Sequence, residues 1–145
     1  KIRNTIPLAA IGADIITGFP GETDTEFNDT CEFLDSSELS YLHVFSFSKR
    51  AGTAAYEMKG QVSPQTIHSR SKKLQALSVK KKKAFIQKCK GMKSSILWEN
   101  EEKPGLIGGF SENYIRVYRR YEKGLEGKIT EHILQETDEF GNFTV

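Results

Sequence analysis

Hydrophobic positions in the first third of the chain change from a continuous run to helical spacing and back. Residues 10–18 are almost entirely apolar, which is typical of a parallel strand covered on both faces. Residues 23–36 carry apolar side chains at helical spacing, and residues 41–47 are aromatic and β-branched. The pattern therefore predicts a right-handed βαβ unit with parallel strands.

Polar residues give further detail of this unit. Thr23 and Glu26 have the spacing of a capping box, which places the helix start at Thr23. Asp14 is an acid inside the first apolar run. An unpaired buried carboxylate is costly, so Asp14 is either hydrogen-bonded in the core or part of a site.

Two loops follow the two expected strands. The first runs from Gly18 through Phe-Pro-Gly to Thr23, and the second covers Ser48–Thr53. Both lie at the carboxyl ends of parallel strands, where ligands of α/β proteins usually bind, so we expect them at the same edge of the sheet. Arg50 in the second loop is either a solvated cation or an anion contact.

The second half of the chain changes period twice. Ser63-Pro64 is a favourable helix start, and apolar spacing predicts a long helix over residues 64–90. Beyond Gly91, short apolar stretches at 94–99, 106–110, 113–118, 128–134 and 143–145 alternate with Gly-rich turns. This spacing predicts a small antiparallel β-barrel. The expected fold is an α/β piece over 1–62, a long basic helix over 63–90, and the barrel over 91–145.

Charge is distributed unevenly, although the 145-residue chain has a net charge of only +2. Between residues 70 and 93 there are ten cations and no acid: Arg70, Lys72, Lys73, Lys80, Lys81, Lys82, Lys83, Lys88, Lys90 and Lys93. A solvated helix face is the ordinary interpretation of such a run. Its one-sidedness favours a polyanionic partner.

A second cluster mixes aromatic and basic residues within the expected barrel. It comprises Tyr114, Arg116, Tyr118, Arg119, Arg120, Tyr121 and Lys123. Ordinary alternation along a strand accounts for part of it. Aromatic rings interleaved with cations also suit RNA, through base stacking and phosphate contacts.

Several classes of function are disfavoured by the remaining features. The two cysteines, Cys31 and Cys89, are too few for a disulfide framework. Neither the cysteines nor the three histidines have the spacing of metal ligands. No apolar run is long enough to cross a membrane, and the N-terminus has neither a signal-peptide core nor a Met. We expect a piece of a longer cytoplasmic protein.

Three blocks carry a family resemblance. GADIITGFPGET (12–23), HVFSFSKRAGT (43–53) and GFSENYIRVY (109–118) together resemble the carboxyl half of a radical S-adenosylmethionine tRNA methylthiotransferase. Ala51 stands where this family usually has Pro. The third block is similar to the TRAM domain of the branch that acts on N6-threonylcarbamoyladenosine beside the anticodon.

The resemblance implies a function for the parent protein. Family members use S-adenosylmethionine and two [4Fe-4S] clusters, whose cysteine motifs are absent from this chain. We therefore expect an inactive fragment that retains part of the cofactor wall and a tRNA-binding surface, with no cofactor bound and weak affinity for S-adenosylmethionine. The implied cofactor residues are Ile16, Thr17, Gly18, Phe45 and Phe47. The expected tRNA contacts are Arg50, Lys72, Lys73, Lys80, Lys81, Lys82, Lys83, Tyr114, Arg116, Arg119 and Arg120.

Other hypotheses remain open at this point. A sister enzyme that methylthiolates a ribosomal protein, and one that acts on isopentenyladenosine in tRNA, have similar sequences. A plain RNA-binding module leaves the ligand-facing βαβ corner unexplained. A generic small-molecule domain leaves the ten cations and the β-rich tail unexplained. Because a two-stranded parallel piece has exposed edges, we also expect self-association.

Overall fold

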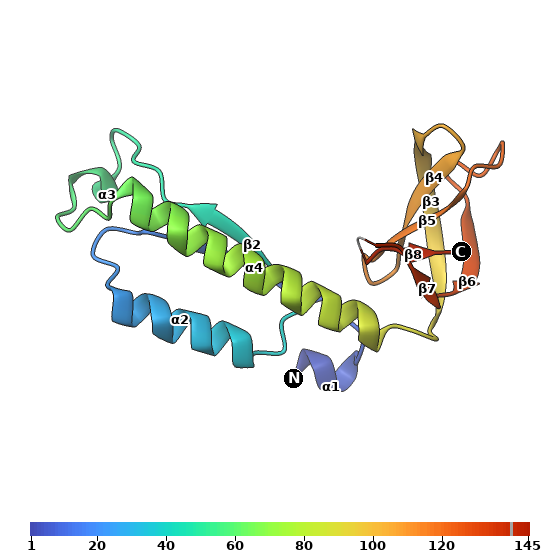
Figure 1. Cartoon of the computed structure of the whole chain (residues 1–145), viewed down its shortest axis with the longest axis horizontal. Coiled ribbons are helices and arrows are strands. Elements are labelled where there is room, and N and C mark those ends of the chain that lie inside the picture. Colours follow the sequence, from blue (N-terminus) through green and yellow to red (C-terminus); the bar gives the residue numbers. More distant parts are fainter. Residues whose placement is uncertain (140) are drawn as a thin grey trace. The chain divides into compact units, whose positions relative to one another are not determined.

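Two parallel strands, two helices and most of a third, long helix form one of the two compact units of the chain, Ile11–Lys82 (Figure 1). The other unit combines Lys1–Ala10 with Lys83–Val145. The computed structural model describes residues 1–139 and 141–145, with the side chains of residues 101–103 outside the described part.

Strands β1 (Gly12–Thr17) and β2 (Tyr41–Ser46) pair in parallel, as the sequence predicts. Helices α2 (Asp24–Ser36) and α4 (Pro64–Lys88) pack against one face of this pair through a core of Phe27, Leu34, Leu42 and Leu74. The opposite face is exposed at Gly12, Asp14 and Ile16 of β1. The prediction of a strand covered on both faces is therefore wrong for this chain.

Local signals fix the start of α2. The Thr23 side chain accepts a hydrogen bond from the Glu26 N–H, and the Glu26 carboxylate accepts one from the Thr23 N–H, which confirms the capping box. The Thr23 N–H and the Thr23 hydroxyl both donate to the Glu26 carboxylate and lower its pKa. A short helix, α3 (Ala54–Glu57), in the loop between β2 and α4 was not expected from the sequence.

The second unit is a six-stranded sheet in the order β6-β3-β4-β5-β8-β7. The strands are β3 (Lys93–Lys103), β4 (Leu106–Ser111), β5 (Arg116–Arg120), β6 (Ile129–Ile133), β7 (Glu136–Thr137) and β8 (Phe143–Thr144). Strands β5 and β8 pair in parallel. The sheet is therefore mixed, and among the described residues no pairing joins β7 to β6 to close a barrel. The predicted small antiparallel β-barrel is therefore wrong in two respects: one strand pair is parallel, and the described strands form an open sheet.

The core of this unit lies on one face of the sheet. Trp98, Ile96, Ile107, Val117 and Phe143 are almost completely buried there. Phe85, Ile86 and Cys89, at and just after the C-terminal end of α4, join the same cluster. A short helix, α1 (Ile2–Thr5), precedes Leu8 and Ala10, which pack against this core.

The strand expected over residues 113–118 begins later, at Arg116. A tight turn occupies the preceding residues, because the Ser111 hydroxyl accepts the Ile115 N–H and donates to the Asn113 side chain. Side-chain hydrogen bonds of this kind replace the strand ladder with a turn. No helix in the described part of the chain combines the length and the apolar character needed to cross a bilayer.

His132 gives the β-sheet unit a testable dependence on pH. Burial, and to a smaller extent the charge of Arg119, lowers the pKa of His132 below 6.5. The unfolded chain therefore binds a proton at a higher pH than the folded chain, so stability falls as the pH drops below about 6.5.

We expect the melting temperature to fall between pH 7.5 and pH 5.5, and to fall less in His132→Gln. Gln retains a hydrogen-bonding partner for Thr130, which the His132 ring contacts at 2.8 Å. Thermal unfolding followed by circular dichroism at the two pH values measures the difference. Equal losses in both proteins would show that His132 does not contribute.

Candidate functional site

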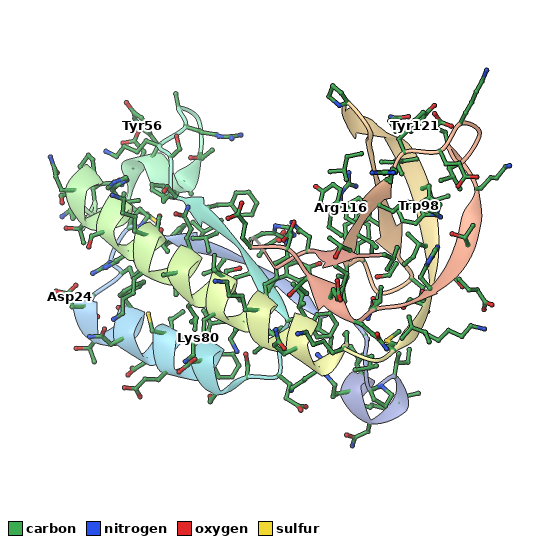
Figure 2. All side chains as sticks on the ribbon, turned by 45° about the vertical axis from the view of Figure 1, so that its right-hand side comes forward. Asp24, Tyr56, Lys80, Trp98, Arg116 and Tyr121 are labelled. Atoms are coloured by element: carbon green, nitrogen blue, oxygen red, sulfur yellow. The ribbon has the colours of Figure 1, made fainter. Side chains whose placement is uncertain are left out.

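A buried arginine holds the loop between β1 and α2. Arg70 of α4 places Nη1 2.7 Å from Oε2 of Glu22 and Nη2 2.7 Å from Oδ1 of Asp24. Asp24 is the first residue of α2 and is labelled in Figure 2. The same Glu22 oxygen accepts the N–H of Gly18 at 2.6 Å. Burial lowers the pKa of Arg70, but its hydrogen bonds to Asp24 and Glu22 outweigh this and raise the pKa. One guanidinium therefore fixes the shape of the loop at the end of β1.

Contacts within the protein explain the glycine at position 18. Its φ of 78° lies in the left-handed region, and a Cβ would overlap with the Ile67 side chain of α4. The side from which a Cβ would project is therefore filled by protein. The contact between adenine and the Gly18 backbone stays a prediction.

Two expected cofactor residues lie together on the open face of the sheet. Ile16 and Phe45 are directly opposite in register and are 58% and 51% exposed. Asp14 and His43 form the exposed pair next to them. The exposure of Asp14 excludes the core role that we considered for it, and its part in a site stays a prediction.

Thr17 has a different surrounding. Its hydroxyl lies 2.7 Å from Ser71 Oγ of α4, and Ser71 Oγ lies 2.8 Å from Ser46 Oγ. The Thr17 carbonyl accepts the Phe47 N–H at 2.8 Å. The side chain and carbonyl of Thr17 therefore join β1, β2 and α4.

A hollow of about 610 Å³ lies at the carboxyl end of β2. Phe47, Lys49, Gln61, Ile67 and His68 are among its lining residues. The Phe47 ring also meets Phe19 of the first loop edge to face, with centroids 5.5 Å apart. The two loops thus lie at the same edge of the sheet, as predicted.

Arg50 follows in the second loop and is exposed. Its carbonyl accepts the Thr53 hydroxyl at 2.8 Å, which shapes the turn. This exposure is compatible with both interpretations of its side chain.

The basic residues of α4 have several different roles. Lys81 is buried and donates to the carbonyls of Asp35 and Ser37 at the C-terminal end of α2, at 3.1 and 2.9 Å. Lys80, which is labelled in Figure 2, lies on α4. It forms an ion pair with Asp35 at 2.9 Å and lowers the pKa of that carboxyl. These two cations stabilise the packing of α4 on α2.

The other expected contacts on α4 are exposed. Lys73 bonds Asn28 Oδ1 at 3.2 Å and lies over the Phe27 ring. Lys72, Lys82 and Lys83 are also exposed. The basic run therefore supplies fewer cations for a partner than its composition indicates.

The β-sheet unit presents a second candidate surface. Tyr114 is 72% exposed, and its ring stacks on Phe110 with centroids 4.6 Å apart and an interplanar angle of 14°. Arg116 lies over the rings of Phe110 and Tyr118 and pairs with Glu99 at 2.7 Å. Its side chain is only 13% exposed, so Arg116 is largely engaged within the sheet.

The two following arginines point to different faces. Arg119 follows the alternation of Val117, lies over the buried Trp98 ring and contacts Glu122 at 3.4 Å. Arg120 shares the face of Arg116 and is exposed. Of the three, Arg120 offers the most accessible charge.

Metal binding finds no support in the described residues, which contain no group of three or more His, Cys, Asp or Glu side chains arranged for an ion. Cys31 is half-buried and Cys89 is completely buried, and they belong to different units. In both cases burial raises the pKa of the thiol. The residues present do not fit an iron–sulfur cluster.

Comparison with curated proteins shows which class the chain resembles. It is 33% identical over 133 residues to a threonylcarbamoyladenosine tRNA methylthiotransferase of Bacillus subtilis, covering 89% of this chain and 30% of the relative. It is 40% identical over 90 residues to a ribosomal protein uS12 methylthiotransferase of Koribacter versatilis, covering 59% and 18%. It is 47% identical over 74 residues to a tRNA-2-methylthio-N(6)-dimethylallyladenosine synthase of Clostridium tetani, covering 51% and 16%.

These relatives share one class of chemistry in their names. The chain spans less than a third of the length of each of them. No family model matches the chain. The chain is nevertheless a relative of the methylthiotransferases over part of their length, which confirms the resemblance found in the three sequence blocks.

Lys81 and Lys82 provide a test of the two kinds of cation. Lys81→Met removes the donor to two carbonyls at the end of α2, and each lost bond costs about 1 kcal/mol or more. Lys82→Met alters an exposed position, where effects stay within about 0.5 kcal/mol. In urea unfolding, Lys81→Met should have a lower midpoint than the wild type, whereas Lys82→Met should keep the wild-type midpoint. Similar midpoints would place Lys81 among the ordinary surface cations.

Proposed function

We propose that the chain is part of a radical S-adenosylmethionine methylthiotransferase that acts on N6-threonylcarbamoyladenosine in tRNA. The Bacillus subtilis relative is the observation that carries this proposal. Its alignment covers 133 residues, more than either unit contains, so both units have counterparts in an enzyme of that name. Within such a protein, the chain supplies RNA-binding surface and one edge of the cofactor site.

The part of the chain proposed to contact the cofactor is the exposed face of β1 and β2. Ile16 and Phe45 form an apolar pair there, which suits contact with a flat purine. Gly18 directly follows β1, and its N–H donates to Glu22. S-adenosylmethionine supplies the radical and methyl chemistry when bound. The residues of this chain contribute apolar contact and a fixed backbone, and the iron–sulfur clusters are held elsewhere in the parent protein.

The expected RNA contacts of the two units, each taken by itself, are exposed cations and exposed aromatic rings. Lys72, Lys82 and Lys83 of α4 and Arg120 of β5 are accessible for phosphate contacts. The β-sheet unit takes the part of the TRAM domain, with Tyr114 as its most exposed aromatic residue.

A second candidate substrate is ribosomal protein uS12, because the Koribacter versatilis relative named for it is 40% identical over 90 residues. Affinities for tRNA and for a uS12-derived peptide can be compared directly. A protein-directed enzyme has less need for phosphate contacts. Binding of tRNA in preference to a uS12-derived peptide favours the tRNA branch, and the reverse order favours the sister enzyme.

Binding of tRNA should depend on the exposed lysines of α4. We expect Lys82→Glu/Lys83→Glu to lower the affinity about tenfold at low salt. It should also reduce the slope of log affinity against log salt by about two, because each phosphate contact releases counterions. Filter binding across a salt series measures both quantities.

A matched variant controls for net charge. Lys1→Glu/Lys59→Glu makes the same change in total charge at exposed positions outside the basic run. It should weaken binding much less. If the two double variants lose equal affinity, the effect is one of net charge, and α4 has no defined role in RNA binding.

Self-association is a separate expectation. We propose that copies of the chain pair through the open face and edges of the β1-β2 sheet, where Ile16 and Phe45 are exposed. Light scattering should give a mass above that of a monomer, and Phe45→Lys should reduce it. A monomer at every concentration tested would contradict this expectation.

A further inference from the structure

A row of side chains crosses four strands on the outer face of the β-sheet unit. Register places Ile129 of β6 opposite Leu97 of β3, Leu97 opposite Phe110 of β4, and Phe110 opposite Arg116 of β5. Ile129 is 66% exposed. Tyr114, from the turn before β5, stacks on Phe110. We call these five residues the stacking row.

The turn holds Tyr114 in a conformation that a non-glycine residue rarely adopts. Its φ is 62°, and it is the only described non-glycine residue with a positive φ. The turn enforces this geometry: the Tyr114 N–H donates to the Ser111 carbonyl at 2.9 Å, and Asn113 anchors the turn to the Leu8 carbonyl and Cys89 Sγ. Strain retained at an exposed aromatic ring points to a role for the ring itself.

The hollow beside this ring has a defined chemistry. Its volume is about 320 Å³, and Leu97, Phe110, Tyr114 and Ile129 line it together with Glu99 and Glu112. Glu112 accepts the Ser95 N–H, and Glu99 pairs with Arg116. Apolar walls with two carboxylates disfavour a phosphate. They suit a flat, uncharged group that carries an amino donor at its edge.

We propose that the stacking row binds one unpaired nucleobase that carries an exocyclic amino group, with its ring stacked on Tyr114. The proposal rests on the proposed function, because it names the part of an RNA ligand that this unit would take. Arg120 lies on the same face of β5 as Arg116 and is exposed, so it is placed to contact a neighbouring phosphate. Stacking then selects an unpaired base, and the glutamates select its edge.

Short fluorescein-labelled oligoadenylate and oligouridylate of equal length test this proposal by anisotropy. The wild-type chain should bind oligoadenylate more tightly than oligouridylate, because uracil lacks an exocyclic amino group. Tyr114→Gly should lower the affinity for oligoadenylate about tenfold, the scale of one lost stacking contact, with an unchanged salt slope. Tyr114→Phe keeps the ring and should bind like the wild type.

Tyr114→Gly also separates binding from folding. Glycine adopts a φ of 62° without strain, so this variant should retain the melting temperature of the wild type. In a second measurement, the adenine H2 protons should shift upfield on binding to wild type and not on binding to Tyr114→Gly. That shift reports directly on a base above an aromatic ring.

Four results would overturn the proposal. If Tyr114→Gly binds oligoadenylate like the wild type while Lys82→Glu/Lys83→Glu weakens tRNA binding, the stacking row fails and the proposed function stands. If wild type binds neither the oligonucleotides nor tRNA, both fail. Equal affinity for the two oligonucleotides removes the role of Glu99 and Glu112. A uS12-derived peptide that binds through Tyr114 without any oligoadenylate binding assigns the face to protein.

Discussion

The buried guanidinium of Arg70 is the interaction on which the strand-end site depends. It neutralises Glu22, which in turn holds the Gly18 N–H, and it reaches Asp24 at the start of α2. Removing one partner of a buried pair leaves an uncompensated charge and costs about 3–5 kcal/mol, far more than the loss of a surface contact. The two-stranded sheet has one covered face, which α2 and α4 cover together, and α4 also supplies this polar anchor. The shape of the loop is therefore determined by a residue 48 positions away from Glu22.

That distance explains which parts of the site could be predicted from the sequence. Thr23 and Glu26 interact across three residues, so their capping box is visible in the sequence and the structure confirms it. Arg70 and Lys81 look like any other cation in a basic run, because nothing local reveals that they bond Glu22 and the carbonyls at the end of α2. Sequence reasoning missed Glu22 for the same reason, although it lies within the block GADIITGFPGET (12–23). The exposure of Asp14 was also not predictable, since an apolar run does not show how many of its faces are covered.

The β-sheet unit was harder to predict in detail. Apolar spacing located β3, β4 and β6 within a few residues, because these strands are long enough to show alternation. Strand β8 lies within the expected stretch 143–145, whereas the two-residue strand β7 was not expected. The parallel pairing of β8 with β5 is a purely long-range contact. The late start of β5 follows from the hydrogen bonds of Ser111 and Asn113, which bend the chain where an alternating pattern predicts a strand. The same turn gives Tyr114 its positive φ, so the feature that broke the prediction is the one that exposes the ring.

The exposed cations of this chain are different residues from the arginines that lie over aromatic rings. This difference affects how such a protein recognises RNA. Arg116 and Arg119 face aromatic rings and glutamates within the sheet, while Lys82, Lys83 and Arg120 stay exposed. Phosphate contacts made by the exposed cations are long-range, weakened by salt and indifferent to sequence. A ring held in place by a strained turn acts only at contact distance, is nearly independent of salt and requires an unpaired base. Affinity and selectivity then depend on different residues, so a substitution can change one and leave the other unchanged. The ion pair between Arg116 and Glu99 makes this independence possible. Glu99 neutralises the charge of Arg116, so Arg116 does not attract a phosphate to the stacked rings of Tyr114 and Phe110.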